Sequence, residues 1–202
     1  INRHVTAADK VIITGGVMYH PMAGFAGGRK SIIPGVAAYS TIQANHRFCL
    51  HEDVGRGLNP RCGSGLLAGN PMHEDQMEIA AMVNPAFLLN AILAPGGGFA
   101  GFVAGHWREA WEEGCRKVAD IYGVPIREKT DLVIASAGGH PKDINFYQAT
   151  KATENALAAC KKDGVLIAVL ECPSIGEPPD FAQWFEMGSL QEREMALREG
   201  FT

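Results

Sequence analysis

Asp131-Leu-Val-Ile-Ala-Ser-Ala-Gly-Gly139 is the stretch of sequence from which the fold class follows most directly. Its short apolar, β-branched run, ended by glycine, predicts a buried strand over Asp131–Ser136. A helix is expected from about Asp143 to Lys162, ended by Gly164, and a further strand over Val165–Glu171. Strand, helix and strand at this spacing predict a right-handed crossover between parallel strands.

The chain before this unit contains the same kinds of element. Lys10–Thr14 predicts a strand ended by Gly15-Gly16, and the Gly- and Pro-punctuated stretch Val17–Gly35 predicts a long ordered loop. Long ordered loops in compact domains are usually functional. The remaining elements are expected to be helices over Tyr39–His51, His73–Val83, Trp107–Tyr122 and Leu190–Glu199, and strands over Phe87–Ala94 and Phe99–Ala104.

The predicted fold class is therefore α/β, with parallel or mixed sheets flanked by helices and parts of two α/β domains. A helix stop at Gly123 with Pro125 just beyond marks the expected boundary. We expect residues 1–125 to be the latter part of an N-terminal domain and residues 126–202 to be the first part of a C-terminal one. The chain opens on Ile1, and we expect it to be a fragment.

The composition excludes several classes of protein. Hydrophobic residues make up 47% and charged residues 20% of the 202 residues, which argues against intrinsic disorder. A net charge of −4 disfavours nucleic acid as a partner, and the apolar run Phe87–Ala94 is too short to cross a membrane. The five cysteines form no C-x-x-C pair and indicate reduced thiols. We expect a cytoplasmic protein with no nucleic-acid or membrane partner.

A glycine-rich segment, Gly24-Phe-Ala-Gly-Gly-Arg-Lys-Ser31, resembles a phosphate-binding P-loop but departs from it at one key position. Arg29 replaces the second obligatory glycine, where a side chain would disturb the nest of backbone N–H groups. The segment also begins ten residues after the predicted strand, whereas a P-loop follows its strand directly. A triphosphatase is therefore improbable. The other interpretations are a turn with a solvated Lys30, or an anion site at Arg29 and Lys30.

Two of the seven histidines, His20 and His46, flank this segment. A lone histidine is more often a hydrogen-bonded structural residue than a ligand or base. The sequence has no H-E-x-x-H motif, so we expect no zinc site built from protein ligands alone. Four further histidines are expected to be structural: His51, His73, His106 and His140.

In the second unit, Tyr147, Gln148 and Lys151 are spaced to share one face of the predicted helix. They follow a strand–loop junction, which is the usual position of a ligand in an open parallel sheet. From spacing alone, a solvated polar face is the simpler interpretation.

Together these motifs resemble the nickel-pincer lactate racemase family. The first is Tyr19-His-Pro-Met-Ala-Gly-Phe-Ala-Gly-Gly-Arg-Lys-Ser-Ile-Ile-Pro-Gly35, followed by Thr41-Ile-Gln-Ala-Asn-His46. The later motifs, in the same order, are Gly69-Asn-Pro-Met-His-Glu-Asp75, Gly138-Gly-His-Pro-Lys-Asp143 and Tyr147-Gln-Ala-Thr-Lys151. The resemblance covers nearly the whole chain.

The resemblance implies a racemase or epimerase of a lactate-like 2-hydroxy acid that works by reversible hydride transfer. Its cofactor would be a nickel-pincer pyridinium mononucleotide held covalently by Lys30, with His46 as the protein ligand of nickel. One imidazole beside soft sulfur ligands suits square-planar Ni(II). Cofactor-biosynthesis proteins would be needed as partners to load it.

The same resemblance implies that His20 is an acid/base histidine, which takes the proton of the substrate hydroxyl. Gln148 and Lys151 would hold and polarise the substrate oxygens, and Tyr147 would line the pocket. The family's D-x-T-R motif and partner histidine have no counterpart in these 202 residues. We therefore expect the isolated chain to be inactive. The alternatives are a non-catalytic module that binds the nickel cofactor, and an unrelated phosphate- or nucleotide-binding α/β protein.

Overall fold

The computed structural model describes residues 1–200, which divide into two compact units. Unit 1 contains Ile1–Gly123 together with residues 194–200, and unit 2 contains Val124–Arg193. Unit 2 is thus an insertion in the sequence of unit 1. Within the described residues, no helix is both long enough and apolar enough to span a membrane.

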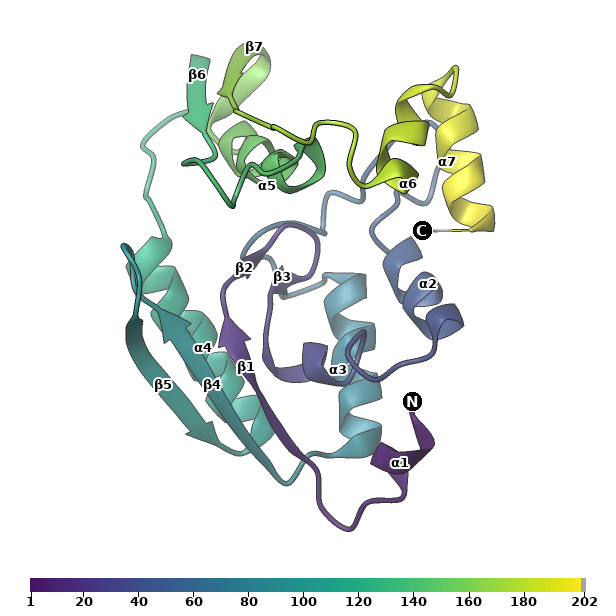
Figure 1. Ribbon diagram of the computed structural model, residues 1–202, viewed down its shortest axis with the longest axis vertical. Coiled ribbons are helices and arrows are strands. Elements are labelled where there is room, and N and C mark those ends of the chain that lie inside the picture. Colours follow the sequence, from purple (N-terminus) through teal and green to yellow (C-terminus); the bar gives the residue numbers. More distant parts are fainter. Residues whose placement is uncertain (201–202) are drawn as a thin grey trace. The chain divides into compact units, whose positions relative to one another are not determined.

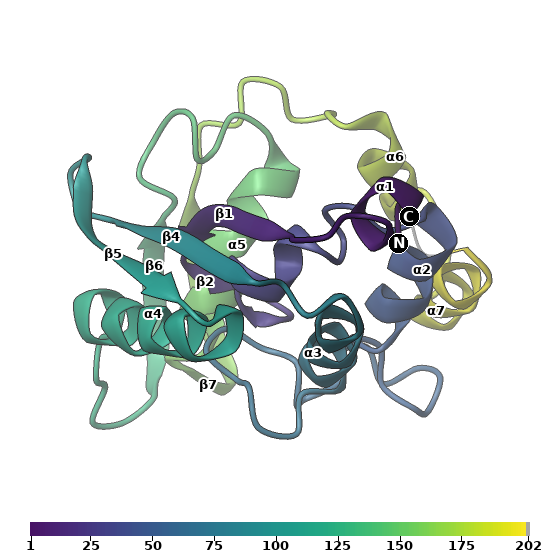
Figure 2. The ribbon, with the colours of Figure 1, turned by 90° about the horizontal axis from the view of Figure 1, so that it is seen from below.

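The sheet of unit 1 has three strands in the order β1, β4, β5, with bounds Ile12–Val17, Phe87–Leu93 and Phe99–Gly105. β1 runs parallel to β4, and β5 runs antiparallel to it. Helix α4 (Trp107–Tyr122) packs against these strands, as Figures 1 and 2 show. The expected α/β class with a mixed sheet is confirmed, and so are both ends of the α4 helix.

The core of unit 1 lies between this sheet and α4. Alternate strand residues point toward the helix, which leaves Val17, Leu88 and Ile92 at most 1% exposed. Burial of one such side chain contributes roughly 1.5–3 kcal/mol to stability. From α4 the core receives Trp107, Ala110, Trp111, Cys115 and Val118.

Two longer helices complete unit 1, α2 (Tyr39–Arg47) and α3 (Pro71–Val83). α3 begins at Pro71, before the expected start at His73, because the Asn70 side chain caps the helix by accepting from the His73 amide and proline suits the first turn. The short elements are α1 (Arg3–Thr6), β2 (Tyr19–His20), β3 (Gly24–Phe25) and the 3₁₀ turn η1 (Gly28–Ser31). The last three lie inside the segment that was expected to be a single loop.

Unit 2 contains the predicted crossover: strands β6 (Thr130–Ser136) and β7 (Cys160–Val169) pair in parallel, with helix α5 (Phe146–Leu157) between them in the chain. The parallel pairing confirms the crossover between parallel strands. Two short elements follow, α6 (Pro179–Ala182) and η2 (Gln183–Phe185). The chain then forms α7 (Leu190–Glu199), which has the bounds expected from sequence.

Several boundaries differ from expectation. β1 does not end at Gly15-Gly16 but continues through them, because both glycines pair with β4 and another loop approaches their backbone closely. α5 ends at Leu157 rather than near Lys162, since the chain from Cys160 onward pairs with β6. α2 ends at Arg47, short of His51.

Candidate active site

The structure brings together two residues that the sequence separates by ten positions, His20 and Lys30. β2 and β3 form a small antiparallel hairpin that places His20 opposite Gly24, and η1 then carries Lys30 back toward it. Lys30 Nζ lies 3.3 Å from His20 Nε2. Both side chains are partly buried, so this contact is shielded from bulk water.

The backbone fixes which nitrogen of His20 carries the proton. The amides of Met22 and Ala23 both donate to Nδ1, at 3.2 and 3.1 Å. A nitrogen that accepts hydrogen bonds is unprotonated, so the neutral ring carries its proton on Nε2. Nε2–H therefore faces the Lys30 amine as a donor.

This arrangement requires Lys30 to be a neutral amine, because an ammonium group cannot accept from Nε2–H. Burial, and secondarily the charge of neighbouring Arg29, lowers the pKa of Lys30 to about 8. At pH 7 a pKa of about 8 leaves roughly a tenth of Lys30 as the neutral, nucleophilic amine that covalent attachment of a cofactor requires, far more than an ordinary lysine has.

His46 lies in the last turn of α2, and its ring orientation is set within the helix. Its Nδ1 lies 2.7 Å from the Ile42 carbonyl, so Nδ1 is the protonated nitrogen and Nε2 carries the lone pair. Burial lowers the pKa of His46 against the raising effect of the Ile42 hydrogen bond, and Lys30 lowers it further whenever its amine is protonated. An imidazole kept neutral with Nδ1–H on a carbonyl is the usual form of a metal-ligating histidine.

The neighbour of His46 ties α2 to α3. The Asn45 side-chain amide is buried and donates to the Met72 carbonyl at 3.0 Å and to Asp75 Oδ2 at 2.7 Å. Its oxygen accepts from Gln76 Nε2 at 3.0 Å. This network, in which both the nitrogen and the oxygen of the Asn45 amide are hydrogen-bonded, holds the helix that carries His46 in place. The sequence shows Asn45 inside a motif but gives no sign of these partners.

Arg29 is completely buried, which excludes the expected alternative of an exposed anion site at this residue. Its guanidinium donates to the carbonyls of Ala23 (2.7 Å) and Phe25 (2.8 Å) and lies 4.1 Å from the centre of the Trp111 ring. Sequence reasoning missed this role, since no local pattern marks an arginine that bonds to backbone oxygens. The nearest signal is a cation within a glycine-rich, apolar stretch.

Two glycines precede Arg29, and neither position leaves room for a side chain. Gly27 and Gly28 have φ of +74° and +54°, in the left-handed region. A Cβ on Gly28 would lie 2.5 Å from the Trp111 ring, and one on Gly27 would lie 2.7 Å from the Gly16 oxygen. The Gly28 amide donates to Asn90 Oδ1 at 2.9 Å. The backbone before Lys30 is thus packed tightly against the sheet and α4.

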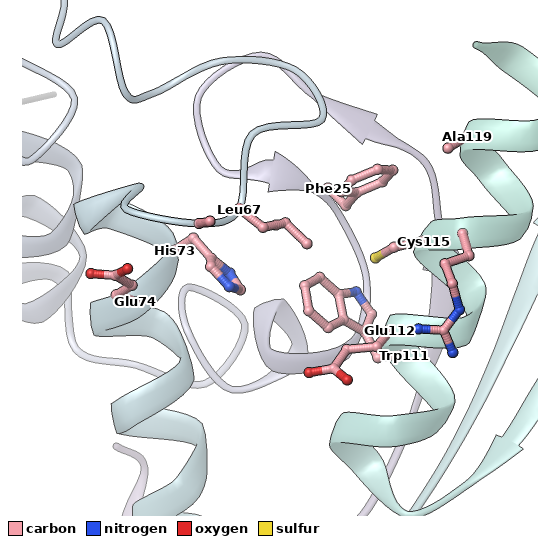
Figure 3. Close-up of a pocket in the computed structure, with 10 residues that line it drawn as sticks. Phe25, Leu67, His73, Glu74, Trp111, Glu112, Cys115 and Ala119 are labelled. Carbon is pink, nitrogen blue, oxygen red and sulfur yellow. The ribbon is translucent and has the colours of Figure 1, made fainter.

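A groove of about 470 Å³ lies elsewhere in unit 1, and none of the predicted site residues lines it. Figure 3 shows His73 and Trp111 at its floor, with Cys115 beside them. The His73 and Trp111 rings stack with centroids 5.5 Å apart. Burial, and then the charges of Arg29 and Arg108, lowers the pKa of His73 to about 4, so this histidine is neutral.

In unit 2 the three predicted residues lie together at the start of α5. Lys151 Nζ donates to Gln148 Oε1 at 2.6 Å and lies 5.9 Å from the centre of the Tyr147 ring. Asn145 caps the helix by accepting from the Gln148 amide at 2.9 Å, which fixes the first turn. The side chains form one polar cluster on an exposed face.

No group of three or more histidine, cysteine, aspartate or glutamate side chains that could hold a metal occurs among residues 1–200. A metal that arrives with most of its ligands needs only one from the protein. The donor set present, an imidazole with its lone pair on Nε2 and a nearby amine of lowered pKa, fits a tethered nickel-pincer group of that kind.

These features define a two-unit α/β protein with a histidine–lysine pair in one unit and a tyrosine–glutamine–lysine cluster in the other. Residues 1–57 match the lactate racemase N-terminal domain, and residues 126–195 match the lactate racemase C-terminal domain. The two matches together cover more than half of the chain. The chain belongs to the lactate racemase family.

Individual relatives agree with this assignment. The lactate racemase of Thermoanaerobacterium thermosaccharolyticum is 38% identical over 186 residues, which are 92% of this chain and 42% of that protein. The lactate racemase of Lactiplantibacillus plantarum is 37% identical over 170 residues, 84% of this chain and 38% of that protein. The chain thus spans less than half the length of these curated relatives.

Solved structures show the same fold. The lactate racemase apoprotein from Thermoanaerobacterium thermosaccharolyticum matches with a TM-score of 0.86 at 34% identity, over 97% of this chain and 46% of that one. A protein from Thermotoga maritima matches with a TM-score of 0.61 at 14% identity, over 98% of this chain and 53% of that one. The second match concerns the fold alone.

Proposed function

We propose that this chain forms part of a 2-hydroxy acid racemase or epimerase of the lactate racemase type. The observation that carries the proposal is the 3.3 Å contact between Lys30 Nζ and His20 Nε2, in a chain of this family. In this proposal residues 1–125 are the latter part of the N-terminal, cofactor-binding domain. Residues 126–202 are the first part of the C-terminal α/β domain.

Lys30 would hold the nickel-pincer pyridinium mononucleotide covalently, and His46 would be the protein ligand of its nickel. When bound, this group supplies the reversible acceptor for the hydride of the substrate carbon. The lowered pKa of Lys30 supports the attachment, because the neutral amine is the nucleophile. The Ile42 carbonyl supports the ligation, because it keeps the proton of His46 on Nδ1.

His20 would move the proton of the substrate hydroxyl. With Nδ1 engaged by two amides, the neutral ring already carries a proton on Nε2, so Nε2 has no lone pair to accept the hydroxyl proton. To act as the base, the ring must first carry its proton on Nδ1 instead, which requires Nδ1 to release the Met22 and Ala23 amides. The imidazolium that forms when Nε2 then takes the hydroxyl proton is the acid that would return a proton to the keto oxygen.

Gln148 and Lys151 would hold and polarise the substrate oxygens, and Tyr147 would line the pocket. An ammonium group fixed by a 2.6 Å hydrogen bond is suited to stabilise charge that develops on an oxygen in the transition state. The substrate is a small 2-hydroxy acid, and loading would need cofactor-biosynthesis proteins. All five cysteines are free thiols, which supports a cytoplasmic location.

We propose that the isolated chain is inactive. Inversion of a carbon centre requires acid/base groups on opposite faces of the substrate, and these 202 residues supply His20 without the family's D-x-T-R motif and partner histidine. Such a chain could still bind the cofactor without turning over substrate.

The test is peptide mass spectrometry with metal analysis on protein co-produced with the enzymes that build the cofactor. A cofactor-sized adduct on the Lys30 peptide, with nickel in equal amount, is the expected result. Lys30→Arg should abolish the adduct, and Lys10→Arg, a change at an exposed lysine of the same unit, should leave it intact. An unmodified Lys30 both here and in a longer protein containing this sequence would refute the proposal.

A further inference from the structure

Burial of the Arg29 guanidinium is energetically unfavourable, and the proposed chemistry gives no reason for it. Within residues 1–200 no carboxylate pairs with the guanidinium and its Nε has no hydrogen-bond partner, and burial lowers its pKa to about 9. An apolar side chain of similar volume would fill the space beside Trp111 without this desolvation cost. What only the arginine provides is the pair of hydrogen bonds to the Ala23 and Phe25 carbonyls.

Those carbonyls belong to the turn that holds His20. Ala23 accepts from Arg29 through its oxygen, and its amide donates to His20 Nδ1. His20 Nε2 in turn contacts Lys30, the residue that follows Arg29 in the chain. The contacts therefore form a closed ring that begins and ends in η1.

We propose that Arg29 is a positioning residue that keeps the proton of His20 on Nε2, facing Lys30, by pinning the turn whose amides occupy Nδ1. The role of this tautomer in catalysis rests on the proposed function. Its presence in the folded chain does not, and it can be measured independently. Other partners hold the same segment in place: the Asn70 amide donates to the Met22 carbonyl at 2.8 Å, and Trp111 Nε1 donates to the Ala26 carbonyl at 3.0 Å. Of the two residues whose amides reach the ring, Met22 is held by Asn70 and Ala23 is held by Arg29.

The direct test is long-range ¹H–¹⁵N spectroscopy of the histidine rings in the 202-residue chain, at a pH where His20 is neutral. His20→Gln assigns the signals. The unsubstituted chain should show one dominant form, with Nε2 protonated. In Arg29→Met the ratio of the Nε2–H to the Nδ1–H form should fall about tenfold, as expected for the loss of one hydrogen bond to Nδ1.

Two control variants distinguish this effect from a general loss of rigidity in the folded chain. Arg116→Met makes the same chemical change where the guanidinium pairs with Glu113 on the surface of α4, at 2.7 Å. Trp107→Phe removes a buried hydrogen bond to Asn84, one turn of α4 away from Trp111. Both controls should leave the His20 pattern unchanged.

A folded Arg29→Met variant with the same His20 pattern as the parent chain would overturn the proposal, and so would an equal change in either control. If Arg29→Met does not fold, Arg29→Lys carries the test, because one ammonium group serves two carbonyls less well. In Arg29→Lys the ratio of the Nε2–H to the Nδ1–H form should fall by a smaller factor than is expected for Arg29→Met. An unchanged ratio would also overturn the proposal. The measurement needs neither cofactor nor turnover, so a Lys30 that stays unmodified would refute the proposed function and leave this result standing.

Discussion

The stability of unit 1 should depend on pH through one buried histidine, His73. The residue is 9% exposed and stacks on Trp111, and its Nδ1 has no hydrogen-bond partner in the part of the chain that the structure describes. Burial, with the charges of Arg29 and Arg108, lowers its pKa from 6.5 to about 4 in the folded chain. In the unfolded chain the pKa returns to its ordinary value of about 6.5.

The sign and size of the effect follow from this difference. Between the two pKa values the unfolded chain binds a proton at His73 that the folded chain does not, so the free energy of unfolding falls as pH falls. The contribution of His73 is fully present above its unfolded pKa. At pH 5 about 2 kcal/mol of it has been lost, taking 1.36 kcal/mol for each unit of pKa difference.

Urea denaturation at pH 8 and pH 5, on the parent chain and on His73→Gln, measures this contribution. Glutamine has a similar shape and does not titrate, so the variant reports the pH dependence of all other groups. The parent chain should lose about 2 kcal/mol more than His73→Gln between the two pH values. His73→Phe, which keeps a ring against Trp111, should behave like the glutamine variant. Equal losses in parent and variants would refute the reasoning.

Three further results are expected. Asn45→Ala should lower the free energy of unfolding by about 3 kcal/mol in urea denaturation, because it leaves several buried polar groups without partners. Glu194→Gln should speed hydrogen exchange at the Gly55 or Gly57 amide about tenfold, because a buried carboxylate that accepts from both amides loses one acceptor oxygen. Lys151→Met, made in a longer and active protein containing this sequence, should lower kcat about a hundredfold and leave folding unchanged, because in the proposed function this exposed side chain polarises the substrate oxygens.

Each of these changes has a matched control. Ser40→Ala alters an exposed residue of α2, the helix that carries Asn45, and should not change stability measurably. Glu192→Gln alters α7 at a carboxylate that caps its own helix, and exchange at the two glycines should stay as it was. Lys161→Met removes an exposed ammonium that pairs with Asp131, and turnover should be unaffected. A control that reproduced the effect of its partner variant would contradict the role assigned to that partner.

Elements whose signals are local were predictable from the sequence, and those decided by distant partners were not. α4 has its apolar stripe, an acidic first turn and a glycine stop within its own residues, and both its ends were predicted correctly. The predicted end of α5 was wrong because the chain from Cys160 onward pairs with β6, beginning at Thr130, and no local pattern shows this pairing. β1 runs through two glycines for the same reason, since its partner strand supplies the hydrogen bonds.

The candidate site also has features that the sequence predicts locally and features that depend on distant partners. Residue types and spacing selected His20, Lys30 and His46, and the resemblance gave them roles that remain predictions. The sequence could not give the proton positions, because these depend on the Met22 and Ala23 amides and on the Ile42 carbonyl. The structural role of Arg29 was missed for a related reason. Its partners are backbone carbonyl oxygens, and because every residue has one, the sequence cannot show which of them an arginine will bind.

The left-handed pair Gly27-Gly28 affects how this motif should be used to recognise active enzymes. Packing against Trp111 and Gly16 excludes a side chain at either position, whatever the segment does chemically. A descendant that had lost His20 or Lys30 would therefore still be selected to keep both glycines, because the fold requires them. The presence of these glycines therefore indicates common ancestry. Whether the activity is retained has to be judged from the residues proposed to transfer protons or to bind the cofactor and its metal.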